Sequence, residues 1–92
     1  MDDVKCAEIT IHGLVQGVGF RHYVYKNAIS IGLKGYVRNM PDGSVFIYAV
    51  GTHEQIQLIF QIASKGPPRS GIIDKHLKYL IEFEVFDNFS IR

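Results

Sequence analysis

The sequence lacks tryptophan altogether and has only one cysteine, three prolines and no long apolar run in its 92 residues. No apolar stretch approaches the roughly 18 residues needed to cross a membrane, so the composition is that of a soluble globular protein. The single Cys6 cannot form an intramolecular disulfide, which agrees with a reducing compartment. The opening MDDVKCAEIT also lacks the basic-then-apolar layout of a secretory signal. We therefore expect a cytoplasmic protein.

The chain also lacks a large net charge, because it has ten Lys and Arg residues and nine Asp and Glu residues. No overall field then draws the chain to nucleic acid or to anionic lipid, and any bound anion must be held by a local arrangement. Linkers, repeats and low-complexity tracts are absent too. The length suits one domain spanning residues 1–92. Without a long amphipathic seam, we expect a monomer that binds neither nucleic acid nor a membrane.

What is present is a regular alternation of strand-like and helix-like segments. Apolar residues alternate with polar ones in the first and last of the strand-like segments, and β-branched and aromatic residues dominate the middle two. The four C-terminal residues FSIR could add a short fifth strand at an edge. The main strands are predicted at residues 4–12, 35–39, 44–50 and about 77–85.

Two segments show helical spacing of apolar residues. The first runs from Phe20 and ends before Gly32, a typical C-terminal stop. The second begins at Thr52, with Gln55 three residues later in the capping-box arrangement, and ends at Gly66. The element order is therefore β-α-β-β-α-β, with the second and third strands joined by a tight turn.

This order predicts an α+β fold, the ferredoxin-like β-α-β-β-α-β two-layer sandwich. A right-handed crossover and a tight hairpin place the third strand between the first two, which gives an antiparallel sheet of order 4-1-3-2 with both helices on one face. The first two strands then end at the same side of the sheet, about 10 Å apart. An arginine side chain can cross that gap, so the topology predicts that Arg21 and Asn39 face a shared hollow.

The first of those strand ends carries the stretch GLVQGVGFR, residues 13–21. Gly13, Gly17 and Gly19 permit positive φ angles, so successive N–H groups can turn inward around an anion at the start of a helix. Arg21 adds a planar, permanently charged group that matches two phosphate oxygens. By itself the pattern also fits a loop that merely turns the chain with Arg21 solvated, and it matches neither the P-loop nor the GxGxxG spacing.

Further motifs follow in order along the chain. They are GLKGYVRN at 32–39, DGSV at 42–45, Gly51 and GP at 66–67, together with Ala28 after GLVQGVGFR. In this order and on these elements, the chain resembles the acylphosphatase family. The resemblance implies a small enzyme that hydrolyses the carboxyl–phosphate anhydride of acyl phosphates to a carboxylate and inorganic phosphate, with no metal and no cofactor.

The resemblance also implies roles for individual residues. The arginine of the FR pair and the loop amides would hold the phosphate, and the asparagine of VRN would position the attacking water; these catalytic residues are Arg21 and Asn39. A loose phosphoryl-transfer transition state needs charge stabilisation and an aligned nucleophile, and an acyl phosphate leaves as a weakly basic carboxylate, so this set suffices chemically. The phosphate-binding residues would be Val15, Gln16, Gly17, Val18, Gly19, Phe20 and Arg21.

One alternative is a phosphate-binding or ligand-sensing module on the same fold, without turnover. An RNA-binding platform built on Phe46 and Tyr48 is less favoured, because the basic-aromatic pattern of such modules is missing, and we expect that pair to pack on the sheet. The run GFRHYVYKNA also resembles the acylphosphatase-like domain that opens hydrogenase-maturation carbamoyltransferases. There a proline usually follows FR, whereas here His22 does, so we expect a free-standing enzyme with His22 solvated and turned away from the site.

Overall fold

The computed structural model describes residues 3–81 and 84–92 of the chain. The elements follow one another in the predicted order, with the additional strand at the C-terminus. They are β1 (Lys5–Leu14), α1 (Phe20–Ile31), β2 (Lys34–Asn39), β3 (Val45–Gly51), α2 (His53–Lys65), β4 (Gly71–Leu80) and β5 (Phe89–Ile91).

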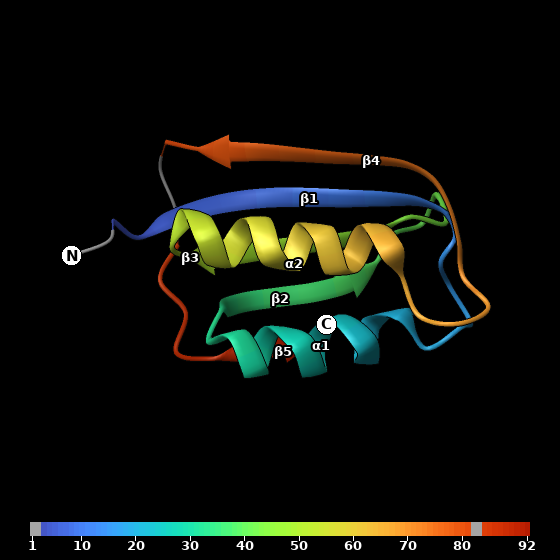
Figure 1. Ribbon diagram of the computed structural model, residues 1–92, viewed down its shortest axis with the longest axis horizontal. Helices are drawn as coiled ribbons and strands as arrows, with labels where there is room; N and C mark the ends of the chain where they lie inside the picture. Colours follow the sequence, from blue (N-terminus) through green and yellow to red (C-terminus); the bar gives the residue numbers. More distant parts are fainter. Residues whose placement is uncertain (1–2, 82–83) are drawn as a thin grey trace.

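The strands form one sheet of order β4-β1-β3-β2-β5, and both helices lie against the same face of it (Figure 1). Pairing is antiparallel throughout the first four strands, whereas β5 joins β2 in parallel. The predicted two-layer sandwich with order 4-1-3-2 is therefore confirmed, and so is the fifth strand. Among the described residues, neither helix combines the length and the apolar character needed to span a membrane.

The core lies between the sheet and the two helices. There, alternate apolar residues of the strands pack against the apolar face of each helix. Alternate residues of β1 face the helices and are fully buried, as the alternation predicts. Both helices contribute one buried stripe each. The central buried side chains are Ala7, Ile9 and Ile11 of β1, Phe20, Val24 and Ala28 of α1, and Ile56, Ile59 and Ala63 of α2.

The helix boundaries follow the predicted signals. Gly32 ends α1 in the left-handed conformation (φ 94°), and its N–H donates to the carbonyl of Ala28 at 3.0 Å. At the start of α2 the capping box is complete. The Thr52 hydroxyl accepts from the Gln55 N–H at 3.2 Å, and the Gln55 side chain accepts from the Thr52 N–H at 2.8 Å.

The last long strand does not lie where the sequence indicates it. The prediction of about 77–85 is wrong at both ends, because β4 covers Gly71–Leu80. Residues 82–83, part of that prediction, lie outside the described residues. β4 is an edge strand whose outer side faces water, so most of its side chains are exposed and its apolar pattern is weak.

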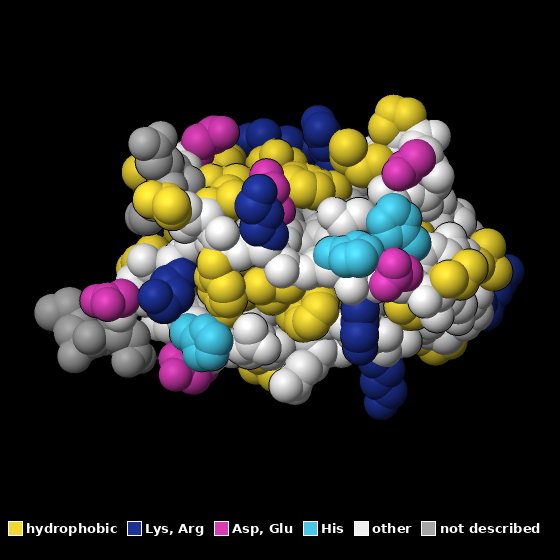
Figure 2. Space-filling view, turned by 90° about the horizontal axis from the view of Figure 1, so that it is seen from above, with side chains coloured by type: hydrophobic (Ala, Val, Ile, Leu, Met, Phe, Trp, Pro, Cys, Tyr) yellow, Lys and Arg dark blue, Asp and Glu magenta, His cyan; other side chains and the backbone are white. Residues whose placement is uncertain are grey.

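A β-bulge explains why the alternation fails in β4. His12 pairs with Asp74 and Gly13 pairs with Ile72, so Ile73 has no partner on β1 and is 84% exposed. One inserted residue moves the following side chains to the opposite face, which breaks a period-2 pattern read along the sequence. The mixed charges of this strand also suit an edge, and Figure 2 shows acidic, basic and histidine side chains interspersed with apolar ones on this side of the molecule.

The sheet face away from the helices is partly covered, whereas the alternation of β1 predicts a fully wet side there. Cys6, Tyr48 and Val50 are buried on this face, and Phe86 packs over them. The rings of Tyr36 and Tyr48 stack at 5.7 Å with 3° between their planes. Tyr48 therefore serves in packing, as expected for an aromatic pair on the sheet.

Candidate active site

The loop that leads from β1 into α1 presents free backbone amides. Gly17 and Gly19 adopt φ angles of 76° and 77°, in the left-handed region that favours glycine. A Cβ atom on either would meet nothing within 4 Å, so the space beside the loop is open. Gly19 is the N-cap of α1, and none of the side chains that the structure describes caps the start of this helix, unlike α2. The first amides of α1 are therefore available to an anion.

Gly13, the first glycine of this stretch, is required for a different reason. It lies within β1 with φ 134°, and a Cβ there would approach the carbonyl oxygen of Gly71 to 2.0 Å. Only glycine allows β1 and β4 to come together at the bulge. Gly13 thus serves strand pairing, whereas Gly17 and Gly19 shape the loop.

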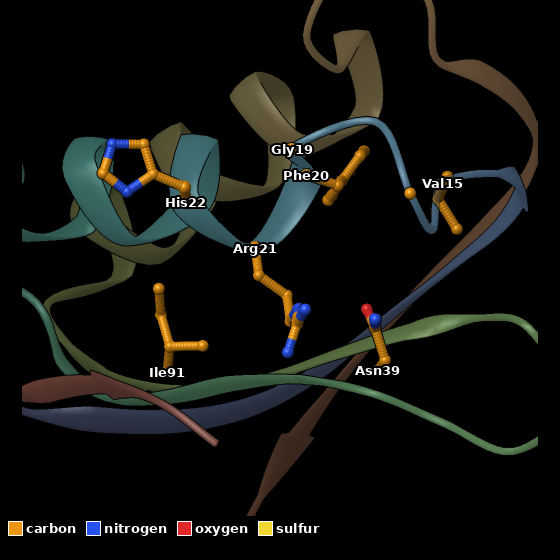
Figure 3. Close-up of a pocket in the computed structure, with 8 residues that line it drawn as sticks. Val15, Gly19, Phe20, Arg21, His22, Asn39 and Ile91 are labelled. Atoms are coloured by element: carbon orange, nitrogen blue, oxygen red, sulfur yellow. The ribbon is translucent and has the colours of Figure 1, made fainter.

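Arg21 brings the positive charge that the loop amides lack. It lies in the first turn of α1, is exposed, and extends from the helix toward the sheet, where its guanidinium group ends beside Asn39 (Figure 3). The one ion pair found among the described residues joins His76 to Asp74, so none of their carboxylates neutralises Arg21. Its charge and its donors remain available to a ligand.

Asn39 ends β2 on the face that the helices cover. Val37, two residues earlier on the same face, is completely buried in the core. Figure 3 shows the Asn39 amide directed toward the loop, next to the end of Arg21. Its Oδ1 atom is buried and has no hydrogen-bond partner among the described residues. Leaving such an acceptor unpaired costs about 1–3 kcal/mol, which is a reason to look for a ligand there.

A cavity of about 240 Å³ joins these groups. Its walls come from the loop and the start of α1 on one side and from the end of β2 on the other, so the predicted hollow shared by Arg21 and Asn39 is present. The predicted site residues that line it are Val15, Gly17, Gly19, Phe20, Arg21 and Asn39.

Comparison with known proteins agrees with this arrangement. The family model described as Acylphosphatase matches residues 7–91. The chain belongs to the acylphosphatase family. It is 41% identical over 85 residues to a protein of Syntrophotalea carbinolica named acylphosphatase, and the match covers 92% of each chain. Membership of the acylphosphatase family places the chain among hydrolases that act on acyl phosphates, as the sequence motifs indicate.

Solved structures of acylphosphatases share the fold. The crystal structure of acylphosphatase from Bacillus subtilis superposes with a TM-score of 0.92 at 34% sequence identity, over 96% of this chain and 98% of that one. A full-length HypF structure superposes with a TM-score of 0.87 at 27% identity, but the match covers only 12% of that much longer chain. The second similarity agrees with the expected likeness to one domain of a larger protein.

Two predicted phosphate-binding residues, Gln16 and Val18, are not part of the cavity wall. The Gln16 side chain points instead to the turn after β2, donating from Nε2 to the carbonyls of Met40 at 2.8 Å and Ser44 at 2.9 Å. Val18 is partly buried against the core. Within the acylphosphatase fold, these side chains therefore hold the loop in place, and a role for their amides stays a prediction.

The turn that receives Gln16 is itself held by hydrogen bonds. Asp42 accepts from the Ser44 hydroxyl at 2.6 Å and from the Ser44 N–H at 2.9 Å. These bonds, the hydroxyl first, lower the pKa of Asp42 below its usual value. The carboxylate therefore stays ionised and keeps the turn closed next to Asn39.

Two residues on the cavity wall are not among the predicted site residues. His22 is exposed and lines the cavity beyond Arg21, and Figure 3 shows its imidazole directed away from Arg21, as expected for a solvated side chain. Ile91 of β5 lines it as well. The adjacency of His22 to Arg21 was the available signal for the first. For Ile91 the sequence offers no such signal, because the pairing of β5 with β2 cannot be predicted from a three-residue strand.

The cavity wall was also searched for acidic side chains and for groups that could bind a metal ion. None of the described residues on the cavity wall is acidic. Within residues 3–81 and 84–92, no group of three His, Cys, Asp or Glu side chains is placed to hold a metal ion. The described wall is therefore suited to an anion.

Proposed function

We propose that this protein hydrolyses acyl phosphates by directing a water molecule at a phosphate group held in this cavity. Arg21 and the amides from Val15 to Phe20 bind the phosphate, and Asn39 positions the water. The observation that carries the proposal is the buried Oδ1 atom of Asn39, which has no hydrogen-bond partner in the described part of the chain and belongs to the same cavity as Arg21. Membership of the acylphosphatase family supports the choice of substrate class.

Binding of the phosphate rests on charge and on free donors. The uncapped start of α1 offers N–H groups and the positive end of the helix dipole. Arg21 contributes a permanent charge with a planar set of donors that fits two phosphate oxygens. In the transition state, negative charge spreads over the equatorial oxygens, and these groups stabilise it without having to move.

Asn39 supplies the direction of attack. Its Oδ1 atom accepts a hydrogen bond from water, which leaves a lone pair of the water oxygen free to point at phosphorus. The amide is not usefully basic near neutral pH, so it orients the water and does not remove its proton. Alignment of this kind lowers the barrier because the entropy of bringing water and phosphate together is lost on binding.

The reaction balances without a covalent enzyme intermediate. The water oxygen forms a bond to phosphorus while the bond from phosphorus to the acyl oxygen breaks, and the carboxylate leaves with that electron pair. The proton of the water passes to an oxygen of the phosphate itself. Products are one carboxylate and one inorganic phosphate. A carboxylate is a weak base, so it needs no protein acid to leave.

The test is hydrolysis of benzoyl phosphate by the wild type, Arg21→Gln and Asn39→Ala in the presence of a chelator. We expect wild-type turnover to persist with the chelator and kcat to fall at least about 10²-fold in each variant, as on removal of one transition-state donor. Arg21→Gln should also weaken competitive inhibition by inorganic phosphate, whereas Asn39→Ala should change it little.

Arg38→Gln is the matched control, because Arg38 neighbours Asn39 but is exposed on the opposite face of β2. It should leave turnover close to that of the wild type. Wild-type hydrolysis no faster than hydrolysis in buffer would overturn the proposed activity. Phosphate binding that depends on Arg21, with no turnover, would instead identify a phosphate-binding module.

A further inference from the structure

We propose that β4 pairs with β4 of a second copy of this chain, in an antiparallel two-fold register centred on His76, and that the two copies form a weak dimer with one continuous sheet. No residue of β4 lines the cavity between Arg21 and Asn39, so the dimer leaves that cavity open and does not depend on the proposed function. It departs from the monomer that the sequence favours.

The strand β4 is the longer of the two edge strands of the sheet, with ten residues against the three of β5. It comes first in the order β4-β1-β3-β2-β5, so in the part of the chain that the structure describes only β1 pairs with it. Figure 1 shows β4 along the upper rim of the sheet, with both helices below it. Such an edge carries a row of unpaired N–H and C=O groups and can accept another strand.

The charges of β4 make this edge complementary to itself. Asp74 and Lys78 are both exposed and lie on the sheet face away from the helices, the face on which Leu80 packs beside Cys6. In an antiparallel pair centred on His76, Asp74 of each copy comes opposite Lys78 of the other. Two-fold symmetry makes this contact twice in each dimer.

The other two-fold registers of this segment lack such a match. A centre at Asp74, Lys75 or Lys78 places two identical charges directly opposite each other. A centre at Leu77 brings Lys78 opposite His76 and gives neither charge a partner of the other sign. Opposite charges across a pair of strands stabilise the pairing and like charges destabilise it, so the charge pattern selects the register centred on His76.

The contacts that Asp74 makes within one chain do not prevent this pairing. Its carboxylate accepts from the Lys75 N–H at 2.9 Å and lies 3.0 Å from Nε2 of His76. The backbone hydrogen bond, with smaller help from His76, lowers the pKa of Asp74, so its charge is present at neutral pH. Both contacts are exposed to water, and exchanging them for Lys78 of a second copy costs little.

Apolar side chains beside the charged segment add area to the contact. The same register brings Ile73 of each copy, which is 84% exposed, opposite Tyr79 of the other, which is 37% exposed. Pairing removes part of both side chains from water. A single pair of edge strands still buries less than the roughly 1,200 Å² of a stable interface, so we expect dissociation in the micromolar to millimolar range.

Sedimentation equilibrium of the full chain at low salt, where charge pairs are least screened, tests the pairing. The wild type should pass from monomer to dimer between micromolar and millimolar concentration. Asp74→Lys and Lys78→Asp each place like charges opposite each other twice in a dimer, so each should raise the dissociation constant at least about tenfold. Asp87→Lys makes the same change of charge as Asp74→Lys at an exposed residue just before β5, on the other edge of the sheet, and should leave the constant unchanged.

An equimolar mixture of Asp74→Lys and Lys78→Asp gives the sharpest comparison. One chain then presents two lysines and the other two aspartates, so heterodimers should form at least as tightly as the wild-type dimer, although neither variant associates well alone. A mixture of Asp87→Lys and Lys78→Asp carries the same net charges and should not recover association. A wild type that stays monomeric over the whole range, or a first mixture that does not associate, would overturn the proposal.

Discussion

Asn39 and Tyr48 each bury a polar atom, but the hydrogen bonding of the two atoms differs. The Tyr48 hydroxyl accepts a hydrogen bond from the Glu84 N–H at 3.1 Å, and the side chain packs in the cluster with Cys6 and Val50. The Oδ1 atom of Asn39 has no such partner among the described residues. A satisfied buried group stabilises the fold, whereas an unsatisfied one weakens it and is best explained by a ligand.

Tyr48 makes a pH-dependent contribution to stability that can be measured. Burial, followed by a hydrogen bond with Cys6, raises its pKa from 10.0 to about 12. Above pH 10 the unfolded chain loses this proton while the folded chain keeps it, so the free energy of unfolding falls as the pH rises toward 12. Urea unfolding at pH 8 and pH 11 should show a larger loss for the wild type than for Tyr48→Phe. An equal loss in both proteins would contradict the assignment.

At the scale of elements, one side chain of the loop before α1 anchors that loop to a distant turn. Gln16 donates to the carbonyls of Met40 and Ser44, on either side of the turn that follows Asn39. The loop before α1 and the end of β2 come from distant parts of the sequence, so this link keeps the two sides of the cavity in register. We propose that Gln16 acts as a positioning residue for the proposed reaction.

Gln16→Ala should lower kcat for benzoyl phosphate by roughly tenfold with a smaller change in KM, because misaligned water and phosphate react more slowly even when binding persists. The free energy of unfolding should fall by about 1 kcal/mol for the lost hydrogen bonds. Steady-state kinetics and urea unfolding measure the two effects. Gln61→Ala, an exposed change on α2, is the control. A stability loss with an unchanged kcat would assign Gln16 a purely structural role.

Elements with strong local signals were predicted well, and those without them were not. Both helices and the turn at Gly43 follow capping and turn residues that act within a few positions. β4 was misplaced because the bulge at Ile73 shifts the alternation, and a bulge depends on the partner strand. The hydrogen bonds of Gln16 were missed for a similar reason, since their acceptors lie more than twenty residues away.

At the scale of the whole molecule, the short β5 closes the sheet beside the site. Phe89 is only 4% exposed and belongs to the central core, although its strand has three residues. Backbone bonds tie both ends of this strand to β2: the Gly35 N–H donates to Asn88 at 3.0 Å, and the Arg92 N–H donates to Val37 at 2.8 Å. The C-terminal segment is thus part of the fold and carries Ile91 to the cavity.

Phe89→Ala should lower the free energy of unfolding by about 3–5 kcal/mol, because it removes a buried ring and leaves a cavity. That is a large share of the roughly 5–15 kcal/mol that stabilises a typical domain. Urea unfolding followed by circular dichroism measures it. Ile73→Ala, at a residue 84% exposed, should change stability by less than about 0.5 kcal/mol. Similar small losses in both variants would show that β5 contributes little.

The sequence by itself determined the order of elements, the two-layer topology, the glycine-shaped loop, and the pairing of Arg21 with Asn39. These follow from periodicity, capping, turn chemistry and the handedness of crossovers, all of which act locally or limit topology strongly. Only the tertiary structure decided that Oδ1 of Asn39 has no hydrogen-bond partner within residues 3–81 and 84–92, that Gln16 bridges to the next turn, and that Ile91 reaches the cavity. Each of these depends on which distant residues come into contact, and no local pattern in the chain specifies that.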